Sequence, residues 1–364
     1  MSKLDEARKQ INEIDQKMAD LFALRMKAVE QVAAYKKELG LPVLDTAREE
    51  EVIRKNARFM QEEALKSYYV NFLKYNMALS RSYQHRLLEG MRVAYSGVPG
   101  AFADIAAQKI FPDGTAVAYK DFKAAYEGVV NGECDCAVLP IENSYAGDVS
   151  QVMDLAFFGS LSINGIYDME IVQNLIGLPD ASLKDIKEVI SHPQGLGQCA
   201  GYIRDHGFLA HEATNTAVAA QQVAKEGRPE FAAIASSETA ALYGLKVLDK
   251  NINASNINTT RFAVFSRFSS RNAKRDNYFV MNFTVRNEAG SLGKVISIIG
   301  DAGFNLRALK SRPTKELIWE YFFFAEGEGN INSERGAQML ERLKENCSNL
   351  KVVGSFEKEQ MLER

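Results

Sequence analysis

Three short polar motifs contain residue types that can donate a proton or hold an anion. In Asn258-Thr259-Thr260-Arg261-Phe262 a hydroxyl stands beside a fixed cation at the start of an apolar run. That arrangement suits protonation of a leaving group near a substrate carboxylate. The other two motifs precede it, and they are Pro140-Ile141-Glu142-Asn143-Ser144 and Ser191-His192-Pro193-Gln194. We predict that the three motifs meet at one site.

A second set of candidate residues lies on a long amphipathic helix predicted over residues 4–39. Arg25 and Lys36 are about three turns apart, so their side chains point the same way. Arg8 lies on another face, roughly 25 Å from Arg25 along the axis at ~1.5 Å per residue. If both arginines serve one site, Arg8 must come from a second copy of the chain. The alternative is that these cations are solvated helix faces joined by i,i+4 ion pairs.

The hydrophobic periodicity indicates three segments that position these motifs. Residues 1–90 form an all-α domain with helices over 4–39, 46–59 and 63–89, and Asp45 is the expected N-cap of the second helix. Short apolar strands and helices alternate over 91–268, which predicts a two-lobed α/β domain. A polar linker is expected over 269–277. Residues 277–364 then read as a strand–helix–strand–strand–helix–strand unit, the α+β ferredoxin-like layout.

The bulk composition bounds the class of protein. A length of 364 residues predicts two or three domains, and a net charge of −3 argues against a nucleic-acid partner. No apolar run is long enough to cross a membrane, and the charged N-terminus has no signal-peptide core. The spacing Cys134-Asp135-Cys136 does not fit a zinc site, so the four cysteines are expected to be reduced thiols in a cytoplasmic protein.

The three central motifs, in this order, resemble the prephenate dehydratase family over about residues 92–266. The resemblance implies conversion of prephenate to phenylpyruvate, with neither a metal nor an organic cofactor. It implies that Thr260 is the proton donor and that Arg261 binds a prephenate carboxylate. Further residues implied in the pocket are Glu142, Asn143, Ser144, Ser191 and Gln198. From the residues alone, His192 could be the acid or a loop hydrogen-bonder, and Glu142 could equally be a cap or a buried salt-bridge partner.

Residues 4–89 resemble the all-helical chorismate mutases, which are intertwined dimers. The matching pattern is Arg8-x-x-Ile11-x-x-Ile14-Asp15, Leu24-Arg25, Lys36, Asp45-x-x-Arg48-Glu49 and Ser80-x-x-x-Gln84. The resemblance implies that three arginines bind the chorismate carboxylates and that Lys36 and Gln84 bind the ether oxygen. Asp45 and Glu49 would position the hydroxyl, with Ser80 beside a carboxylate-binding group. A pericyclic rearrangement needs such cations and a fixed conformer, and no nucleophile.

The last segment resembles the ACT domain, a dimerising module that binds amino acids. The residues that carry the resemblance are Asn287-Glu288-Ala289-Gly290-Ser291-Leu292 and Lys310-Ser311-Arg312-Pro313. Dehydratases of this kind usually have alanine where Ser291 stands and glutamate where Lys310 stands, so the strength of any effector response is open. The resemblance implies that L-phenylalanine binds near Gly290, Ser291, Leu292, Ser311 and Arg312.

Taken together, the sequence predicts a bifunctional chorismate mutase–prephenate dehydratase, a homodimer or larger homo-oligomer under feedback control by L-phenylalanine. Two alternatives stay open. One is a dehydratase that prefers arogenate, and the other is a non-catalytic amino-acid-binding regulator with the same two-lobed fold. A prephenate decarboxylase is disfavoured because Thr260 is present.

Overall fold

The computed structural model describes residues 2–254, 258–269, 274–314 and 321–363. The chain separates into two compact units, which are considered one at a time. The first contains Met1–Arg92 and Asn131–Asp135, and the second contains Val93–Val130 and Cys136–Arg364. The predicted dehydratase-like and C-terminal segments therefore belong to one unit.

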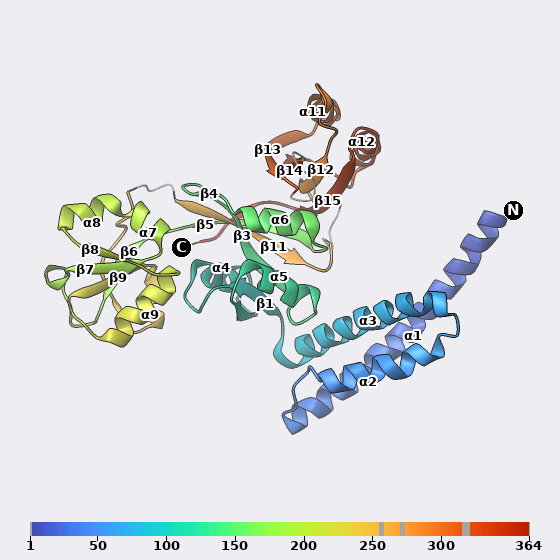
Figure 1. The fold of residues 1–364 in the computed structure, drawn as a ribbon, viewed down its shortest axis with the longest axis horizontal. Coiled ribbons are helices and arrows are strands. Elements are labelled where there is room, and N and C mark those ends of the chain that lie inside the picture. The colour runs from blue at the N-terminus through green and yellow to red at the C-terminus, as the bar shows by residue number, and fades with distance from the viewer. Residues whose placement is uncertain (1, 255–257, 270–273, 315–320, 364) are drawn as a thin grey trace. The chain divides into compact units, whose positions relative to one another are not determined.

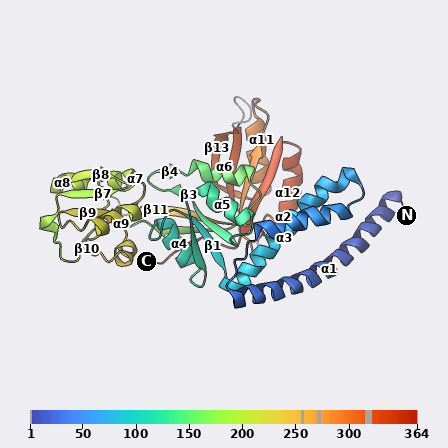
Figure 2. The same ribbon diagram turned by 60° about the horizontal axis from the view of Figure 1, so that its bottom comes forward.

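The regular secondary structure over residues 3–89 of the first unit is all helical, as its periodicity predicted. Its helices are α1 (Lys3–Leu39), α2 (Thr46–Asn56) and α3 (Glu63–Glu89), with a 3₁₀ turn η1 over Ala57–Phe59. Ser2 caps α1 in a reciprocal pair with Asp5, and Gly40 ends it in the left-handed conformation that glycine adopts without a steric penalty. Asp45 accepts the Arg48 backbone N–H at 3.0 Å and so begins α2. The N-terminal part of α1 extends beyond the other two helices (Figures 1 and 2).

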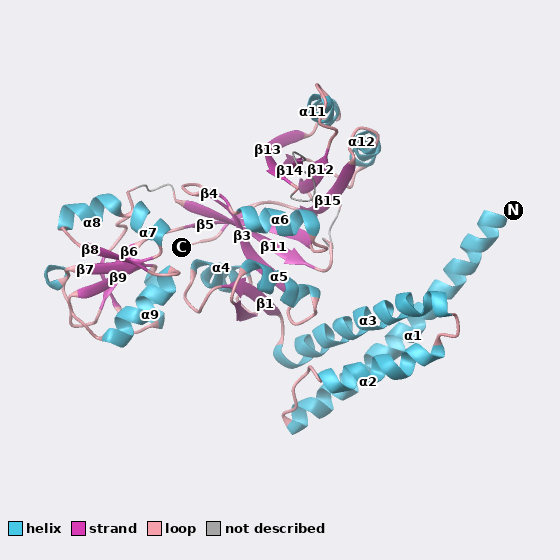
Figure 3. Ribbon diagram, viewed as in Figure 1, coloured by secondary structure: helices cyan, strands magenta, loops and turns pink. Residues whose placement is uncertain are grey.

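The second unit contains two sheets of the α/β region, coloured by element type in Figure 3. The larger sheet has the order β16-β5-β11-β3-β1-β2, with the short β4 paired to β3, and the smaller has the order β10-β6-β9-β7-β8. In the larger sheet β1 pairs with β3 in parallel, whereas β11 runs antiparallel between β3 and β5. Its strands are β1 (Arg92–Ser96), β2 (Thr115–Tyr119), β3 (Cys136–Asn143), β4 (Gly147–Asp148), β5 (Ser162–Glu170), β11 (Thr259–Ser266) and β16 (Gln360–Met361).

The smaller sheet is a lobe inserted between β5 and β11 of the larger one. Its strands are β6 (Asn174–Gly177), β7 (Glu188–Ser191), β8 (Leu209–Glu212), β9 (Phe231–Ala235) and β10 (Lys246–Asp249). The helices of the α/β region are α4 (Phe102–Ile110), α5 (Phe122–Val130), α6 (Ser150–Phe158), α7 (Pro193–Gln198), α8 (Ala200–His206), α9 (Thr216–Glu226) and α10 (Ser237–Leu242), with the 3₁₀ turn η2 (Leu183–Asp185).

Two chain segments connect the lobes and bond to each other. The Ile171 N–H donates to the Asn258 carbonyl at 2.7 Å, and the Ile252 N–H donates to the Gln173 carbonyl at 2.9 Å. The Asn258 side chain, which is almost fully buried, also donates to the Ile171 carbonyl at 3.2 Å. These bonds satisfy backbone groups that would otherwise be buried without partners between two sheets. The connection therefore fixes the chain immediately before Thr260.

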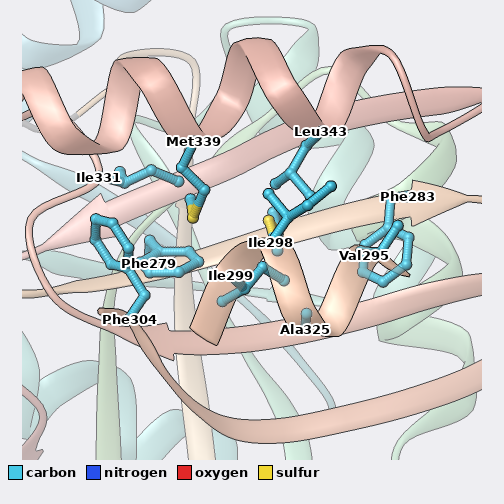
Figure 4. Packing of buried hydrophobic residues seen from close by; sticks show 11 residues of the cluster. Phe279, Phe283, Val295, Ile298, Ile299, Phe304, Ala325, Ile331, Met339 and Leu343 are labelled. Carbon is cyan, nitrogen blue, oxygen red and sulfur yellow. The ribbon is translucent and has the colours of Figure 1, made fainter. Parts of the chain in front are cut away.

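The C-terminal segment has the predicted βαββαβ layout. Its elements are β12 (Tyr278–Thr284), α11 (Ser291–Asp301), β13 (Asn305–Pro313), β14 (Tyr321–Glu328), α12 (Glu334–Lys344) and β15 (Asn349–Phe356), and the sheet order is β13-β14-β12-β15. Alternate residues of β12, such as Phe279 and Phe283, pack against Val295 of α11 and Met339 of α12 (Figure 4). This period of two on the strand and three to four on the helices is the pattern that the sequence displays.

Several expectations need correction or lie outside the described residues. The second helix ends at Asn56 rather than at 59, because residues 57–59 tighten into a 3₁₀ turn. Part of the expected linker, 270–273, and the start of the strand expected over 317–325 lie outside the described residues. Asp276, expected in a solvated linker, is instead buried and accepts a bond from Ser355 at 2.6 Å. Among the described residues, no helix combines the length and apolar character needed to cross a membrane.

Candidate active sites

A cavity of about 830 Å³ in the α/β region contains residues from all three central motifs. Pro140, Asn143 and Thr260 line it from the larger sheet, and His192 and Gln194 line it from the smaller lobe. Gln173 of the connection lies between them. The expectation that the three motifs meet is therefore confirmed. The volume is in the range of sites that enclose a small organic molecule.

Asn143 and Thr260 form the polar centre of this cavity. The Asn143 side-chain oxygen accepts the backbone N–H groups of Tyr145 at 3.0 Å and Ala146 at 2.9 Å, which fixes the orientation of the amide. Its nitrogen must then point toward Thr260, and it donates to Oγ1 at 2.9 Å. Because Oγ1 accepts this bond, the Thr260 proton is free to be donated into the cavity. The residues are 7% and 8% exposed, so little water competes for that proton.

Several helices begin at the wall of this cavity, α4, α6 and α9 among them. Residues 101–103 at the start of α4, 149–151 at the start of α6, and 215, 216 and 218 at the start of α9 all line it. A helix N-terminus presents backbone N–H groups without helical partners and carries a partial positive charge. Several such ends directed at one cavity favour an anionic ligand, which the net charge of −3 would otherwise repel weakly.

Formal charges among the described lining residues are few. Lys120 is the one lysine or arginine, and Asp148 is the one acidic residue. The Asp148 carboxylate is already paired with Lys310 at 2.6 Å. The cavity thus offers a cation to a bound anion, while its carboxylate is occupied.

His192 has the structural role that the sequence left open. Its Nδ1 accepts the Gln194 N–H at 3.2 Å and caps α7, so the ring is neutral with its proton on Nε2. Burial lowers the pKa of His192 below its ordinary value of 6.5, although nearby Glu212 opposes the shift. The Gln194 side chain in turn donates to Asn143 Oδ1 at 3.3 Å. His192 therefore supports the Asn143–Thr260 pair indirectly.

Four residues expected in the pocket lie elsewhere. Arg261 and Glu142 point away from the cavity because they are the strand neighbours of Thr260 and Asn143, and successive side chains on a strand face opposite sides. They form an ion pair at 3.2 Å, so the salt-bridge interpretation of Glu142 is confirmed. Ser144 is exposed and accepts the Thr259 N–H at 2.9 Å. Ser191 is fully buried and donates to the Ile234 carbonyl at 2.7 Å.

In the helical unit, residues from α1 and α3 meet. The Arg25 guanidinium donates to Ser80 Oγ and lies 3.5 Å from the Asn76 carbonyl. Gln84, one turn after Ser80, is buried, and its side-chain oxygen has no partner among the described residues. Burial lowers the pKa of Arg25, as expected of a cation held partly out of water. The structure thus brings together Arg25, Ser80 and Gln84.

The other candidates of the helical unit have local partners. Lys36 donates to the Val43 carbonyl at 2.6 Å, Arg48 pairs with Glu51 at 2.6 Å, and Asp45 caps α2. Glu49 pairs with Arg81, a residue that the sequence analysis did not select. Arg8 is exposed near the N-terminus of α1, 17 residues before Arg25. One chain by itself therefore does not gather the whole expected set.

Comparisons with known proteins find a family match for the α/β region and another for the helical unit. The family model for prephenate dehydratase matches residues 93–270, and the model for chorismate mutase type II matches residues 7–85. An Arabidopsis thaliana arogenate dehydratase/prephenate dehydratase is 32% identical, over 73% of this chain and 72% of the relative. The chain belongs to the prephenate dehydratase family.

Another relative matches both units in a single chain. A bifunctional chorismate mutase/prephenate dehydratase from Aquifex aeolicus is 29% identical over 98% of this chain and 99% of its own length. A prephenate dehydratase from Arthrobacter aurescens, solved in complex with L-Phe, is 27% identical with a TM-score of 0.67 and covers 74% of this chain and 90% of that one. This prephenate dehydratase family member is thus a bifunctional enzyme of phenylalanine biosynthesis with a chorismate mutase domain.

Polar lining residues of this dehydratase that belong to no motif escaped the sequence analysis. Lys120 and Gln173 line the cavity, and Gln173 donates to Gln198 at 3.2 Å. Gln198 was selected from the motif, whereas its partner Gln173 lies in a connection between lobes with no motif of its own. The sequence offered one signal for Gln173: it is a polar residue at the end of an apolar stretch, directly before a new strand. Residues 97 and 98, which follow β1, also line the cavity.

Proposed function

We propose that the α/β cavity binds prephenate and that Thr260 protonates the departing hydroxide. The supporting observation is the bond from Asn143 to Thr260 Oγ1, in which the threonine oxygen accepts and its own proton stays free for donation. Breaking the C–O bond releases water, the ring carboxylate leaves as carbon dioxide, and the electron pair of its broken C–C bond enters the ring, which becomes aromatic. The Asn143 N–H stabilises the negative charge that develops on Oγ1. Thr260 then recovers a proton from solvent.

Prephenate fits the charges of the cavity better than arogenate. Both carry two carboxylates, but arogenate has an ammonium group where prephenate has a ketone. Lys120 would repel the ammonium, and the Asp148 carboxylate that could pair with it is bound to Lys310. The named activities of the Arabidopsis relative include both substrates, so this preference is a property to measure.

We propose further that the mutase site is built by two chains of a homodimer. The side chains of Leu4, Ile11 and Leu21 on α1 are 58%, 56% and 64% exposed. Such a stripe is unusual on a monomer and fits a second α1 packed along it. That packing would bring Arg8 of a second copy toward Arg25, Ser80 and Gln84, as the helix geometry requires. Arg48, Lys36, Asp45 and Glu49 would complete the chorismate site.

The C-terminal βαββαβ segment is proposed to be an ACT domain that senses L-phenylalanine. Gly290 has a φ of 85° and precedes Ser291 and Leu292, the first residues of α11. The backbone at such a turn can approach an amino-acid ligand closely. Ser311 and Arg312 lie on β13, against which α11 packs. Inhibition requires that the ligand prefer one state of the enzyme over another.

A cytoplasmic location remains a prediction. None of the four cysteines, all of which the structure describes, forms a disulfide. The activities are tested by supplying chorismate to the full chain and measuring phenylpyruvate after adding base. Prephenate and arogenate are then compared as direct substrates, with and without L-phenylalanine. We expect phenylpyruvate from chorismate, and a kcat/KM for prephenate that exceeds the value for arogenate. Accumulation of prephenate without phenylpyruvate would contradict the dehydratase assignment. Equal kcat/KM values would contradict the preference.

A further inference from the structure

Two adjacent cross-strand pairs on β3 and β11 face opposite sides of the larger sheet. Thr260 lies opposite Asn143, and Arg261 lies opposite Glu142. The first pair faces the cavity, and the second faces the C-terminal segment. A β-bulge follows at once, because Arg261 pairs with Glu142 whereas Phe262 pairs with Pro140. Bulges of this kind turn a side chain to a new direction and are common beside active sites.

Charged residues of the C-terminal segment contact the Arg261–Glu142 pair. The Arg261 guanidinium donates to both oxygens of Glu326 on β14, at 3.0 and 2.7 Å, and to Glu359 at 2.5 Å. Glu142 also forms an ion pair with Lys310 on β13, at 2.9 Å. A bidentate arginine–carboxylate contact fixes both distance and orientation. The strand that carries Thr260 is therefore tied to β14 and to the chain after β15.

Arg261 is not available to a substrate in this arrangement. Glu142, Glu326 and Glu359 surround it, and the carboxylate of Asp168 lies 3.5 Å from its Nε. Burial alone would lower the pKa of Arg261, but these carboxylates outweigh the burial and raise it. Glu326 is 4% exposed, so a buried carboxylate would lose its counter-ion if Arg261 turned toward the cavity.

The same segment also holds a helix that begins at the cavity. Arg312 on β13 pairs with Asp154 of α6 at 2.8 Å. Lys351 on β15 donates to the Ala156 carbonyl at 2.9 Å and to the Gly159 carbonyl, at the C-terminal end of α6. A cation there complements the negative end of the helix dipole. The docked C-terminal segment thus contacts two structures that shape the cavity, the β3–β11 pair and α6.

We propose that Arg261 is a positioning residue through which the docked C-terminal segment holds Thr260 and Asn143 in their reactive geometry. Arg261 touches no substrate. Its effect passes along β11 and β3, from the Arg261–Glu142 pair to the neighbouring Thr260–Asn143 pair. This inference rests on the proposed role of Thr260 as the proton donor. It also supplies a physical route by which binding events in the C-terminal segment alter dehydratase turnover.

The kinetic signature separates positioning from substrate binding. For Arg261→Met we expect kcat to fall by up to about 10²-fold, as displacement of a reacting group by about 1 Å can cause. We expect the KM for prephenate to change by less than about threefold, because Arg261 lies outside the cavity. Arg261→Lys should recover part of kcat. A large rise in KM with kcat preserved would overturn the proposal, because it would mean that Arg261 binds substrate.

Two controls keep the test decisive. Arg228 pairs with Glu188 at 2.5 Å in the smaller lobe, so Arg228→Met removes an ion-paired arginine without touching β11. It should leave kcat unchanged, and the near-UV circular dichroism spectrum of each variant reports whether the α/β unit is folded. If Arg261→Met is unstable, Arg261→Met combined with Glu326→Gln avoids the unpaired buried carboxylate. The same loss of kcat is expected in that folded double variant, and normal turnover there would overturn the proposal.

A double-mutant cycle links Arg261 to Thr260. If Arg261 acts through the threonine, Arg261→Met should cause almost no further loss of kcat in a Thr260→Ala chain. A full multiplicative loss in that background would overturn the positioning role. Near-normal turnover of Thr260→Ala by itself would instead contradict the proposed function, so the two failures are distinguishable.

Discussion

The two units solve the same electrostatic problem by different means. Both are expected to hold a dicarboxylate. The α/β cavity presents helix N-termini, amide groups and one lysine for this purpose, whereas the helical unit is proposed to use Arg8, Arg25, Lys36 and Arg48. Within a helix the backbone N–H groups are consumed by the helix itself, and they are free only at its first turn. A site built along the sides of helices must therefore take its positive charge from side chains. A site where helices begin can take it from the backbone.

The comparison has a second consequence for oligomeric state. The α/β cavity is enclosed by residues of one chain, and its polar centre is already formed. The helical set is divided, because Arg8 stands on the exposed part of α1 away from the Arg25–Ser80 contact. Dehydratase activity should therefore be a property of each chain, and mutase activity a property of the dimer.

The largest expected effect is on the cavity. Thr260→Ala should lower dehydratase kcat by about 10²- to 10⁴-fold, the range typical for loss of a general acid, and leave mutase activity unchanged. Thr260→Ser keeps the hydroxyl and is the matched control. Steady-state assays with prephenate and with chorismate check both activities. Near-full dehydratase turnover of the alanine variant would remove Thr260 from the mechanism.

The matching change in the helical unit is Lys36→Ala. Loss of a cation at the oxygen that gains charge should reduce mutase kcat by about 10²- to 10³-fold and spare the dehydratase. Lys27, exposed on the same helix, provides the control substitution Lys27→Ala. Chorismate consumption measures the effect. Equal mutase activity of the two variants would mean that Lys36 has no catalytic role and serves only to bond the Val43 carbonyl.

Mixing two inactive chains tests whether the mutase site is shared. In a dimer of one Arg8→Ala chain and one Lys36→Ala chain, one of the two sites has neither lesion. Random exchange makes half of the dimers mixed, so about a quarter of the normal mutase activity should return. Native mass spectrometry would establish that mixed dimers have formed. Mixed dimers without recovery would mean that each chain builds its own site.

A smaller effect is expected at the cation of the cavity. Lys120→Met should raise the KM for prephenate by about 10-fold, the size of one lost charge-assisted contact of about 1.4 kcal/mol. The KM for arogenate should change less, because its ammonium group gains from the loss of the lysine. Lys123→Met removes a nearby exposed lysine as the control. Parallel changes for the two substrates would contradict a discriminating role.

The smallest effect concerns pH. Because the pKa of His192 is lowered in the folded chain, the unfolded chain binds more protons between that pKa and about 6.5. The free energy of unfolding should therefore fall as the pH drops through this window, and dehydratase activity should fall with it as Nδ1 ceases to accept the Gln194 N–H. His192→Asn retains a capping oxygen and should flatten both profiles. Unfolding titrations and kcat between pH 5 and 7.5, a range chosen about the ordinary histidine value, would measure this. If stability and kcat still fell at low pH in the His192→Asn variant, another group would be responsible for the pH dependence.

Much of the fold follows from local patterns. The spacing of apolar residues placed α1 and α3 within one residue of their observed bounds, because a helix that buries one face must repeat every three to four residues. The Asp45 cap was predicted because its side chain can satisfy a backbone N–H group three residues later. Several strands of the α/β region, among them β2, β5, β6, β8 and β10, were not predicted individually, because their exposure pattern depends on neighbours distant in the chain.

The sequence by itself determined which chemistry is available, through Thr260, Asn143 and the cations of α1. Only the tertiary structure decided which of these groups meet. Thr260 and Arg261 are adjacent in the chain, yet one faces the cavity and the other faces Glu326, since neighbouring strand residues point to opposite sides. Lys120 and Gln173 belong to no motif and were placed at the cavity by sheet topology. Motifs record side-chain types, whereas the direction of each side chain is set by the pairing of strands far apart in sequence.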